Sequence, residues 1–102
     1  MQESKPIARL KHALSHGNIW LSALSIMRQK KAYAYTLPEE IQKKFSFKPS
    51  RLMTYFVLYR LESEGLISSK FEGRRKYYSL TKKGRQALFE AKKALSSLAG
   101  KL

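Results

Sequence analysis

Residues 61–84 read LESEGLISSKFEGRRKYYSLTKKG, and this stretch decides the fold that we expect. Gly65 can adopt the left-handed conformation that ends a helix, and the apolar residues after it begin an extended run. Gly73 suits a tight turn between two strands, which we expect over 66–71 and 76–80. The stretch therefore predicts the end of a helix followed by a two-stranded hairpin.

Three cations, Arg74, Arg75 and Lys76, come directly after the predicted hairpin turn. A hairpin tip projects further from the core than the rest of its sheet, so these charges are placed to contact a polyanion. Thr81 then suits the N-cap of a last helix, expected over 81–98. The order of helix, strand, basic tip, strand and helix is the pattern of a winged helix-turn-helix domain.

The composition indicates one basic domain over residues 1–102. Lys and Arg number 21 against 7 acidic residues, which gives a formal net charge of +14 and a pI near 10.3. Such a charge favours polyanionic partners, nucleic acid above all. The chain has no cysteine, which excludes disulfides, zinc fingers and thiolate catalysis.

The sequence lacks the common catalytic patterns. Without Asp or Cys it has neither a Ser-His-Asp set nor a thiol nucleophile, and it has no glycine-rich phosphate loop. His12 and His16 have a spacing that can chelate a metal, but Glu3 is the only acidic residue near them. We therefore interpret the two histidines as polar side chains on a solvent-exposed face and not as a metal site. We therefore expect no enzyme activity, no metal and no cofactor.

No segment predicts export or insertion into a membrane. The first residues carry scattered charges and lack the apolar core of a signal peptide. The longest apolar stretch, 55–59, falls far short of the ~20 residues that span a bilayer. We therefore expect no membrane partner and a cytoplasmic location.

Two helices are expected in the first part of the chain. Apolar residues recur at helical spacing over 5–15 and predict a short amphipathic helix. Asn18 is a suitable N-cap for a second helix, whose broad apolar face ends at the basic run 28–31. This second helix opens the winged-helix core, which we expect over 18–80.

A helix-turn-helix pair is expected next. Thr36 and Glu39 fit a capping box at the start of a helix over 37–45. Residues 46–49 form the turn, and the longest interior helix begins at residue 49 or 50 and continues to about residue 64. By its position this is the recognition helix.

Helical geometry divides the recognition helix into two faces. The core face holds Ser50, Thr54, Val57, Leu58 and Leu61. The other face meets solvent, a partner or DNA, and it holds Arg51, Leu52, Tyr55, Tyr59 and Glu62.

The chain resembles the PadR-like family of transcription regulators over residues 19–88. Tyr33-Ala34-Tyr35 stands where the family usually has a Gly-Tyr pair, and Tyr55 matches the typical tyrosine of the recognition helix. Leu52-Met53 replaces the small Gly-Thr pair that usually precedes that tyrosine. The remaining matches are Leu58, Leu61-Glu62, Gly65-Leu66-Ile67, Gly73-Arg74-Arg75-Lys76-Tyr77-Tyr78, Leu80-Thr81 and Gly84. The double-tyrosine end of the wing and the long last helix favour this family over MarR-like or ArsR-like winged domains.

The resemblance implies a sequence-specific regulator that binds double-stranded DNA as a homodimer, often as a repressor released by a small molecule. The recognition helix would enter the major groove and the wing would follow the flanking backbone. The residues expected to contact DNA are Lys48, Ser50, Arg51, Tyr55, Arg74, Arg75 and Lys76. Trp20, Tyr33 and Tyr35 could line an effector cavity, although aromatic residues at such spacings are more often plain core.

The last helix carries an apolar seam suited to dimerisation. Gly84 begins a series of small and apolar residues that alternate at intervals of four and three, as in a coiled coil. The predicted dimer contacts are Leu88, Ala91, Leu95 and Leu98 of this helix, with Ile7, Leu10 and Leu14 of the N-terminal helix across the same seam. The alternative is that both helices fold back on their own subunit. The expected fold is thus mostly α with a small β-hairpin, a winged helix-turn-helix with an extra N-terminal helix and a long C-terminal dimerisation helix.

A second function class stays open at this point. A basic winged domain can also serve as a chromatin-like DNA packaging protein, or as an adaptor that docks other proteins. Leu52, Phe56 and Tyr59, on or near the outward side of the recognition helix, support the adaptor alternative.

Overall fold

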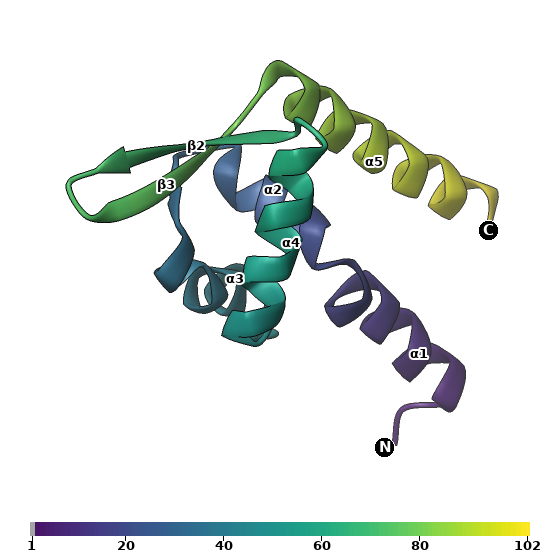
Figure 1. Ribbon diagram of the computed structural model, residues 1–102. Helices are drawn as coiled ribbons and strands as arrows, with labels where there is room; N and C mark the ends of the chain where they lie inside the picture. The colour runs from purple at the N-terminus through teal and green to yellow at the C-terminus, as the bar shows by residue number, and fades with distance from the viewer. Residues whose placement is uncertain (1) are drawn as a thin grey trace.

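The computed structural model describes residues 2–102 and is mostly helical, with one small antiparallel sheet (Figure 1). In chain order, with η for a short 3₁₀ helix, the elements are α1 (Lys5–Leu14), η1 (His16–Asn18), α2 (Ile19–Met27), β1 (Ala32–Tyr33), η2 (Ala34–Thr36), α3 (Leu37–Phe45), α4 (Arg51–Ser63), β2 (Ile67–Glu72), β3 (Arg75–Leu80) and α5 (Lys82–Lys101). The expected fold class is confirmed.

The molecule has a central body and two helical arms. Helices α2, α3 and α4 form the body together with the base of the sheet, and the β2–β3 hairpin projects from one side of it (Figure 1). Helices α1 and α5 extend from the other side, so both termini lie far from the hairpin tip (Figure 1). The resulting particle is elongated, with principal extents of 49 × 27 × 21 Å.

Helix α2 lies at the centre of the core because most of its surface is apolar. It packs against α3, α4, α5 and β3. The most deeply buried side chains come from α2, α3 and α4 and include Leu24, Leu37, Ile41 and Leu58. Thr54 is the one buried polar residue of α4, and its hydroxyl is satisfied because it donates to the Ser50 carbonyl at 2.8 Å.

Helix α4 begins and ends where its sequence signals predicted. The Ser50 hydroxyl caps it by accepting a hydrogen bond from the Met53 N–H at 3.1 Å. At the other end Gly65 has φ +78°, and the N–H of Leu66 donates to the Leu61 carbonyl at 2.9 Å. This is the glycine-dependent helix ending that leads directly into a strand.

The wing differs slightly from its prediction. Strands β2 and β3 are antiparallel, with Ile67 opposite Leu80 and Glu72 opposite Arg75. Gly73 has φ +63°, and only Gly73 and Arg74 lie between the strands. Arg75, expected just after the turn, is therefore already part of β3.

The sheet has a third strand that the sequence did not predict. Strand β1 consists of Ala32 and Tyr33, which pair with Tyr78 and Tyr77 of β3 and give the strand order β1-β3-β2. A two-residue strand has no periodicity from which to recognise it.

Two predicted helix caps are wrong. Thr36 does not form a capping box with Glu39; its hydroxyl donates to the Tyr33 carbonyl at 3.2 Å, although α3 has the predicted bounds. The Asn18 side chain does not cap α2 either. Its amide donates to the Ala13 carbonyl, and its oxygen accepts from the Trp20 ring N–H at 3.0 Å. Asn18 thus joins the end of α1 to α2 rather than capping a helix.

Helix α5 is joined closely to the wing. The Thr81 hydroxyl accepts from the Gly84 N–H at 3.0 Å and donates to the Gly65 carbonyl at 2.6 Å. Gly84 lies so close to β2 that a Cβ on it would stand 1.9 Å from the Leu66 carbonyl oxygen. The helix then continues to Lys101, three residues beyond its predicted end.

The apolar seam of α5 is divided between two roles. Leu88 is only 5% exposed and belongs to the core of its own domain, so it is not free for the predicted dimer contact. Leu95 and Leu98 are 41% and 58% exposed on the projecting part of the helix. The part of the seam open to a partner therefore begins near Ala91, which is half-buried.

Candidate nucleic-acid interface

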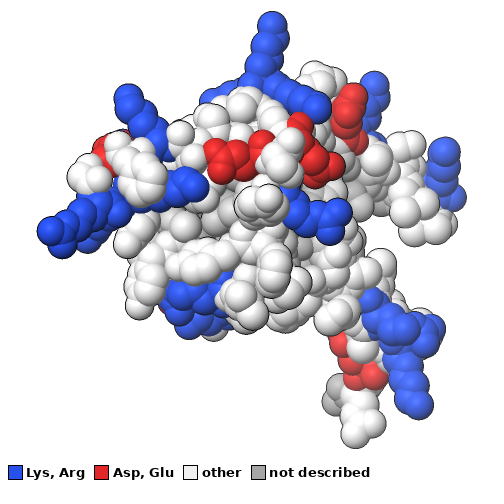
Figure 2. Space-filling view, in the orientation of Figure 1, with Lys and Arg blue, Asp and Glu red and all other residues white. Residues whose placement is uncertain are grey.

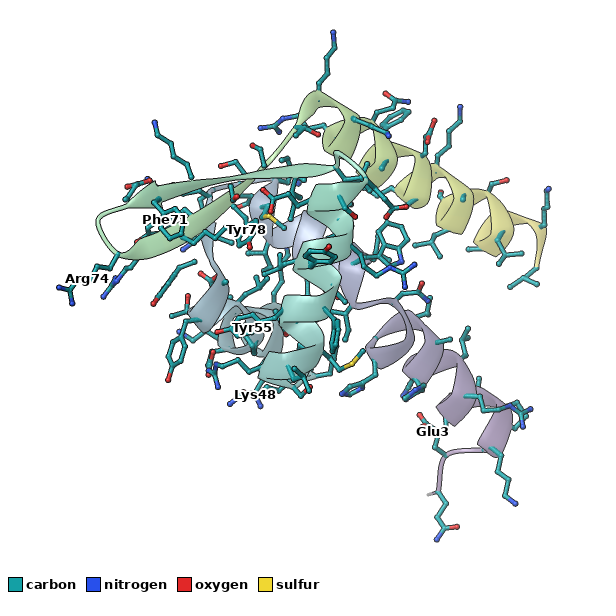
Figure 3. All side chains as sticks on the ribbon, viewed as in Figure 1. Glu3, Lys48, Tyr55, Phe71, Arg74 and Tyr78 are labelled. Atoms are coloured by element: carbon teal, nitrogen blue, oxygen red, sulfur yellow. The ribbon has the colours of Figure 1, made fainter. Side chains whose placement is uncertain are left out.

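The first turn of α4 is held in place by polar contacts within the chain. Ser50 uses its hydroxyl to cap the helix. The Lys48 ammonium lies 3.6 Å from Glu39 Oε1, with about half of the lysine side chain exposed. Lys48 stands at the lower end of α4 in Figure 3, where it can still reach an external anion.

Arg51 is the most constrained of the predicted DNA-contacting residues. Its Nη2 donates to Glu39 Oε1 at 2.6 Å, and Nη2 and Nε donate to the Tyr35 carbonyl at 3.2 and 3.3 Å. Its guanidinium lies 4.3 Å from the centre of the Tyr35 ring. Arg51 therefore braces α4 against η2 and α3. Its predicted contact with a base stays a prediction, for which Nη1 is the guanidinium nitrogen outside these bonds.

Glu39 is the functional residue that sequence reasoning missed. The pKa of its carboxyl is lowered, first by a hydrogen bond from the backbone N–H of Glu39 itself and then by Arg51 and Lys48. The carboxylate is therefore ionised at neutral pH and fixes both cations. No local pattern could have identified this role, because Glu39 and Arg51 are 12 residues apart and belong to different helices.

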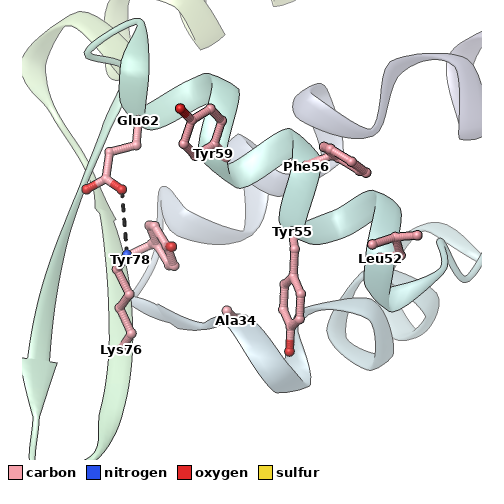
Figure 4. Close-up of a pocket in the computed structure, with 8 residues that line it drawn as sticks. All are labelled: Ala34, Leu52, Tyr55, Phe56, Tyr59, Glu62, Lys76 and Tyr78. Atoms are coloured by element: carbon pink, nitrogen blue, oxygen red, sulfur yellow. Dashed lines mark ion pairs between the residues drawn. The ribbon is translucent and has the colours of Figure 1, made fainter.

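The outward face of α4 is apolar and open to solvent. Leu52, Tyr55, Phe56 and Tyr59 are 66%, 42%, 56% and 73% exposed. With Ala34 of η2 and part of β3 they line a groove of about 610 Å³ between the helix and the wing (Figure 4). The outward orientation predicted for this face is confirmed.

One weak ion pair crosses this groove. Lys76 Nζ of β3 lies 3.9 Å from Glu62 Oε1 of α4, as the dashed line in Figure 4 marks. Part of the charge of Lys76 is therefore compensated within the protein.

The wing cations differ in their freedom. Arg74 lies at the hairpin tip and points away from the body (Figure 3). Among residues 2–102 it neither forms an ion pair nor lies over an aromatic ring. The Arg75 guanidinium lies 5.1 Å from the centre of the Tyr33 ring. Of the three predicted wing cations, Arg74 is thus the most available to an external phosphate.

The charge distribution separates this face into zones. Figure 2 shows basic side chains at the wing tip and along both arms, while the surface over α4 is mostly uncharged, with acidic side chains toward its C-terminal end. An uncharged strip flanked by cations suits a contact in which phosphates are held at the sides and an apolar surface lies between them.

The two arms present apolar side chains to solvent. Ile7, Leu10 and Leu14 of α1 are each about half exposed. A groove of about 500 Å³ lies between the arms and α2, lined by residues that include Leu14, Trp20, Ala91 and Leu95. Of the predicted stripes, only Leu14 of α1 meets Ala91 and Leu95 of α5 in this groove.

The three aromatic residues considered for an effector cavity do not line one cavity. Trp20 lines the groove between the arms, while Tyr33 and Tyr35 lie 6.1 Å apart, ring centre to ring centre, at β1 and η2. Tyr33 also packs on Tyr77 of the wing.

The two histidines stack instead of facing a common ligand. The rings of His12 and His16 are 5.6 Å apart, and His16 contacts Phe47 edge-on. Within residues 2–102 there is no cluster of three metal-ligating side chains. Over the same residues, no helix combines the length and the hydropathy needed to cross a membrane.

Comparisons with known proteins agree with this geometry. The model of the family described as "Transcriptional regulator PadR-like family" matches residues 23–90. No curated protein matches the chain. A PadR family transcription regulator from Clostridium difficile R20291 is 27% identical, with a TM-score of 0.76 over 81% of this chain and 92% of that one. A PadR-like transcriptional regulator from Bacillus cereus ATCC 14579 is 29% identical, with a TM-score of 0.74 over 84% and 88%. A PadR family regulator from Eggerthella lenta DSM 2243 is 26% identical, with a TM-score of 0.79 over 92% and 86%.

Proposed function

The chain belongs to the PadR-like family of transcriptional regulators, and we propose that it binds specific sites on double-stranded DNA as a homodimer and acts as a repressor. The members of this family are regulators rather than enzymes, and so is this protein. A cytoplasmic location, where the genome is accessible, is part of the proposal.

One observation carries the DNA-binding proposal: an exposed helix face lies between the basic wing tip and a lysine at the start of the helix. The wing tip with Arg74 and Arg75 is at one end, and Lys48 stands at the start of α4 at the other. Helix α4 would enter the major groove by its N-terminal half, and the wing would follow the flanking phosphates. Arg51 would position α4 through its bonds to Glu39 and to the Tyr35 carbonyl.

The salt dependence of binding tests this arrangement. A dimer that neutralises several phosphates releases counterions, and log K falls with log salt by about 0.9 for each phosphate contact. We expect affinity for a labelled duplex to fall by orders of magnitude between about 50 and 200 mM salt. Equal retention of the duplex at both concentrations would show that the basic surface does not hold it.

The exposed arms support the homodimer. Leu95 and Leu98 on α5, and the stripe of α1, would be covered in a two-fold contact, which removes apolar surface from water. We expect Leu95→Glu to give monomers in light scattering, while Ser96→Glu, one position off the seam, leaves the dimer intact. If the wild-type protein is already monomeric, the proposed homodimer is wrong. The expectation of DNA half-sites about 34–36 Å apart is then wrong as well.

A repressor requires that occupancy lowers transcription. In a reporter with the bound site overlapping a promoter, the wild type should reduce expression and Leu95→Glu should relieve it. If a small-molecule effector exists, the groove between the arms is the proposed place for it, and the fluorescence of Trp20, the only tryptophan, would report its binding.

The packaging or adaptor alternative keeps one observation in its favour, the exposed apolar face of α4 around Phe56. Competition by nonspecific duplex separates it from regulation, since a regulator on its site resists such competition.

A further inference from the structure

The outward face of α4 offers DNA an unusual set of side chains. The residues on its first turns that point outward are Leu52, Tyr55 and Phe56, followed by Tyr59. Bases are usually read in the major groove by Arg, Lys, Asn or Gln, which make paired hydrogen bonds to base edges. None of these four residue types stands among these four side chains, and the exposed Arg60 lies one turn beyond Phe56, in the C-terminal half of the helix.

Two polar residues at the start of this face already make hydrogen bonds within the chain. The Arg51 guanidinium donates to Glu39 and to the Tyr35 carbonyl, and the Ser50 hydroxyl accepts from a backbone N–H. These bonds leave Arg51 with Nη1 and Ser50 with one hydroxyl proton, so neither presents a paired set of donors to a base pair while its present contacts are kept. Lys48 is paired with Glu39 at 3.6 Å and precedes the helix, and a single ammonium suits a phosphate better than a base pair.

Base edges in the major groove carry one apolar group, the C5-methyl of thymine; a cytosine methylated at C5 presents the same group. Leucine and phenylalanine pressed on guanine or unmodified cytosine would strip water from polar atoms without replacing its hydrogen bonds. Pressed on methyl groups, the same side chains bury apolar surface on both sides.

We propose that α4 recognises DNA through methyl groups in the major groove, with Leu52 and Phe56 as the contacting side chains and thymine-rich sequence as the preferred site. This rests on the proposed DNA binding and specifies what it reads. The cations at the wing tip and at Lys48, labelled in Figure 3, hold the backbone, and the apolar face between them senses methyl groups.

Four defined duplexes test the proposal without knowledge of the natural site. Alternating thymine-adenine and uracil-adenine duplexes of equal length differ only in the C5-methyl. Alternating cytosine-guanine duplexes with and without C5-methylation add the same group to the other base pair. Each buried methyl should raise affinity about fourfold. With two or three contacted methyls, we expect the thymine duplex to bind about 15- to 60-fold more tightly than the uracil duplex. Methylated cytosine should bind more tightly than unmodified cytosine.

Variants assign the effect to α4. Replacing both Leu52 and Phe56 with Ala should bring the thymine-to-uracil ratio close to one while leaving the salt dependence unchanged, because no charge is altered. Phe89→Ala removes an equally exposed aromatic ring from α5 and should leave the ratio as in the wild type. Circular dichroism should show native melting for all variants, since the three side chains are exposed.

The outcomes are distinguishable. Equal affinity of the wild type for thymine and uracil duplexes, with the expected salt dependence, would overturn methyl recognition and leave DNA binding intact. A ratio that persists after loss of Leu52 and Phe56 would also overturn it, because the methyl groups would then be sensed elsewhere. Failure to bind any duplex at low salt would refute the proposed function itself.

Discussion

Replacing Gly84 with Ala tests how α5 is attached to the wing. The new Cβ would stand 1.9 Å from the Leu66 carbonyl oxygen and 3.1 Å from Cδ2 of Leu80. The carbonyl belongs to the backbone where β2 begins and cannot rotate away. An ordinary C···O separation is ~3.3 Å, so α5 and β2 would have to move apart by about 1.4 Å.

The magnitude follows from the contacts that this displacement breaks. The Thr81 hydroxyl accepts from the Gly84 N–H, and the Thr81 N–H donates to the Leu66 carbonyl at 3.1 Å. Each of these hydrogen bonds contributes about 1 kcal/mol, and loosened packing of Leu88 adds about 1 kcal/mol. The better helix propensity of alanine offsets up to about 1 kcal/mol. We expect a net loss of about 2–3 kcal/mol, which lowers Tm by roughly 10–20 °C.

Thermal unfolding followed by circular dichroism measures the effect, at one fixed protein concentration because a dimer's Tm depends on it. Gly100→Ala is the matched control: it lies in the same helix, and a Cβ there meets no atom within 4 Å. Its Tm should stay the same or rise slightly. If Gly84→Ala has the same Tm as the wild type, the close approach of α5 to β2 is not a feature of the folded protein.

Three further changes test the interface. Replacing Arg74 and Arg75 with Ala should weaken binding to preferred and random duplexes by similar factors. The slope of log K against log salt should fall by the equivalent of about one or two phosphate contacts. A loss confined to the preferred duplex would show that these arginines contact bases. Because the pKa of Glu39 is lowered, its carboxylate stabilises the fold above the ordinary glutamate pKa of about 4.3 and loses this effect as pH falls through the lowered value. The free energy of unfolding in urea should therefore change less between about pH 5 and 3 for Glu39→Gln than for the wild type. If the two free energies fall in parallel with pH, Glu39 does not contribute in this way. Arg51→Lys keeps the charge but cannot bond to Glu39 and Tyr35 together, so it should destabilise the protein by up to about 1 kcal/mol in the same urea assay. An unchanged stability would mean that Arg51 does not brace α4.

The elements of this fold were predictable where the signal is local. Ser50, Gly65 and Gly73 each act through backbone conformation or a hydrogen bond within a few residues, and the bounds of α4 and of the hairpin followed from them. The helical spacing of the residues in α4 also correctly predicted that the face around Leu52 and Tyr59 points outward.

The errors concern contacts between distant segments. Thr36 and Glu39 have the spacing of a capping box, but Glu39 has a stronger partner in Arg51, which only the folded chain brings near. Strand β1 depends on pairing with Tyr77 and Tyr78, more than 40 residues away along the chain. These choices are made by tertiary packing, which overrides weak local preferences.

The seam of α5 shows the same limit in a different form. Its four-three repeat is continuous in the sequence, yet Leu88 is buried in its own domain while Leu98 projects into solvent. A periodic pattern identifies an apolar stripe without showing what covers each part of it.

Specific recognition of double-stranded DNA by this protein is measured most directly by competition. Genomic fragments retained by the wild-type protein at physiological salt should be challenged with a large excess of random duplex and then sequenced. We predict that a small set of discrete, thymine-rich sites survives an excess of about 10³-fold, the lower range of specificity for regulators. Displacement of all fragments in parallel, with no site preferred, would contradict the account and identify a packaging protein instead.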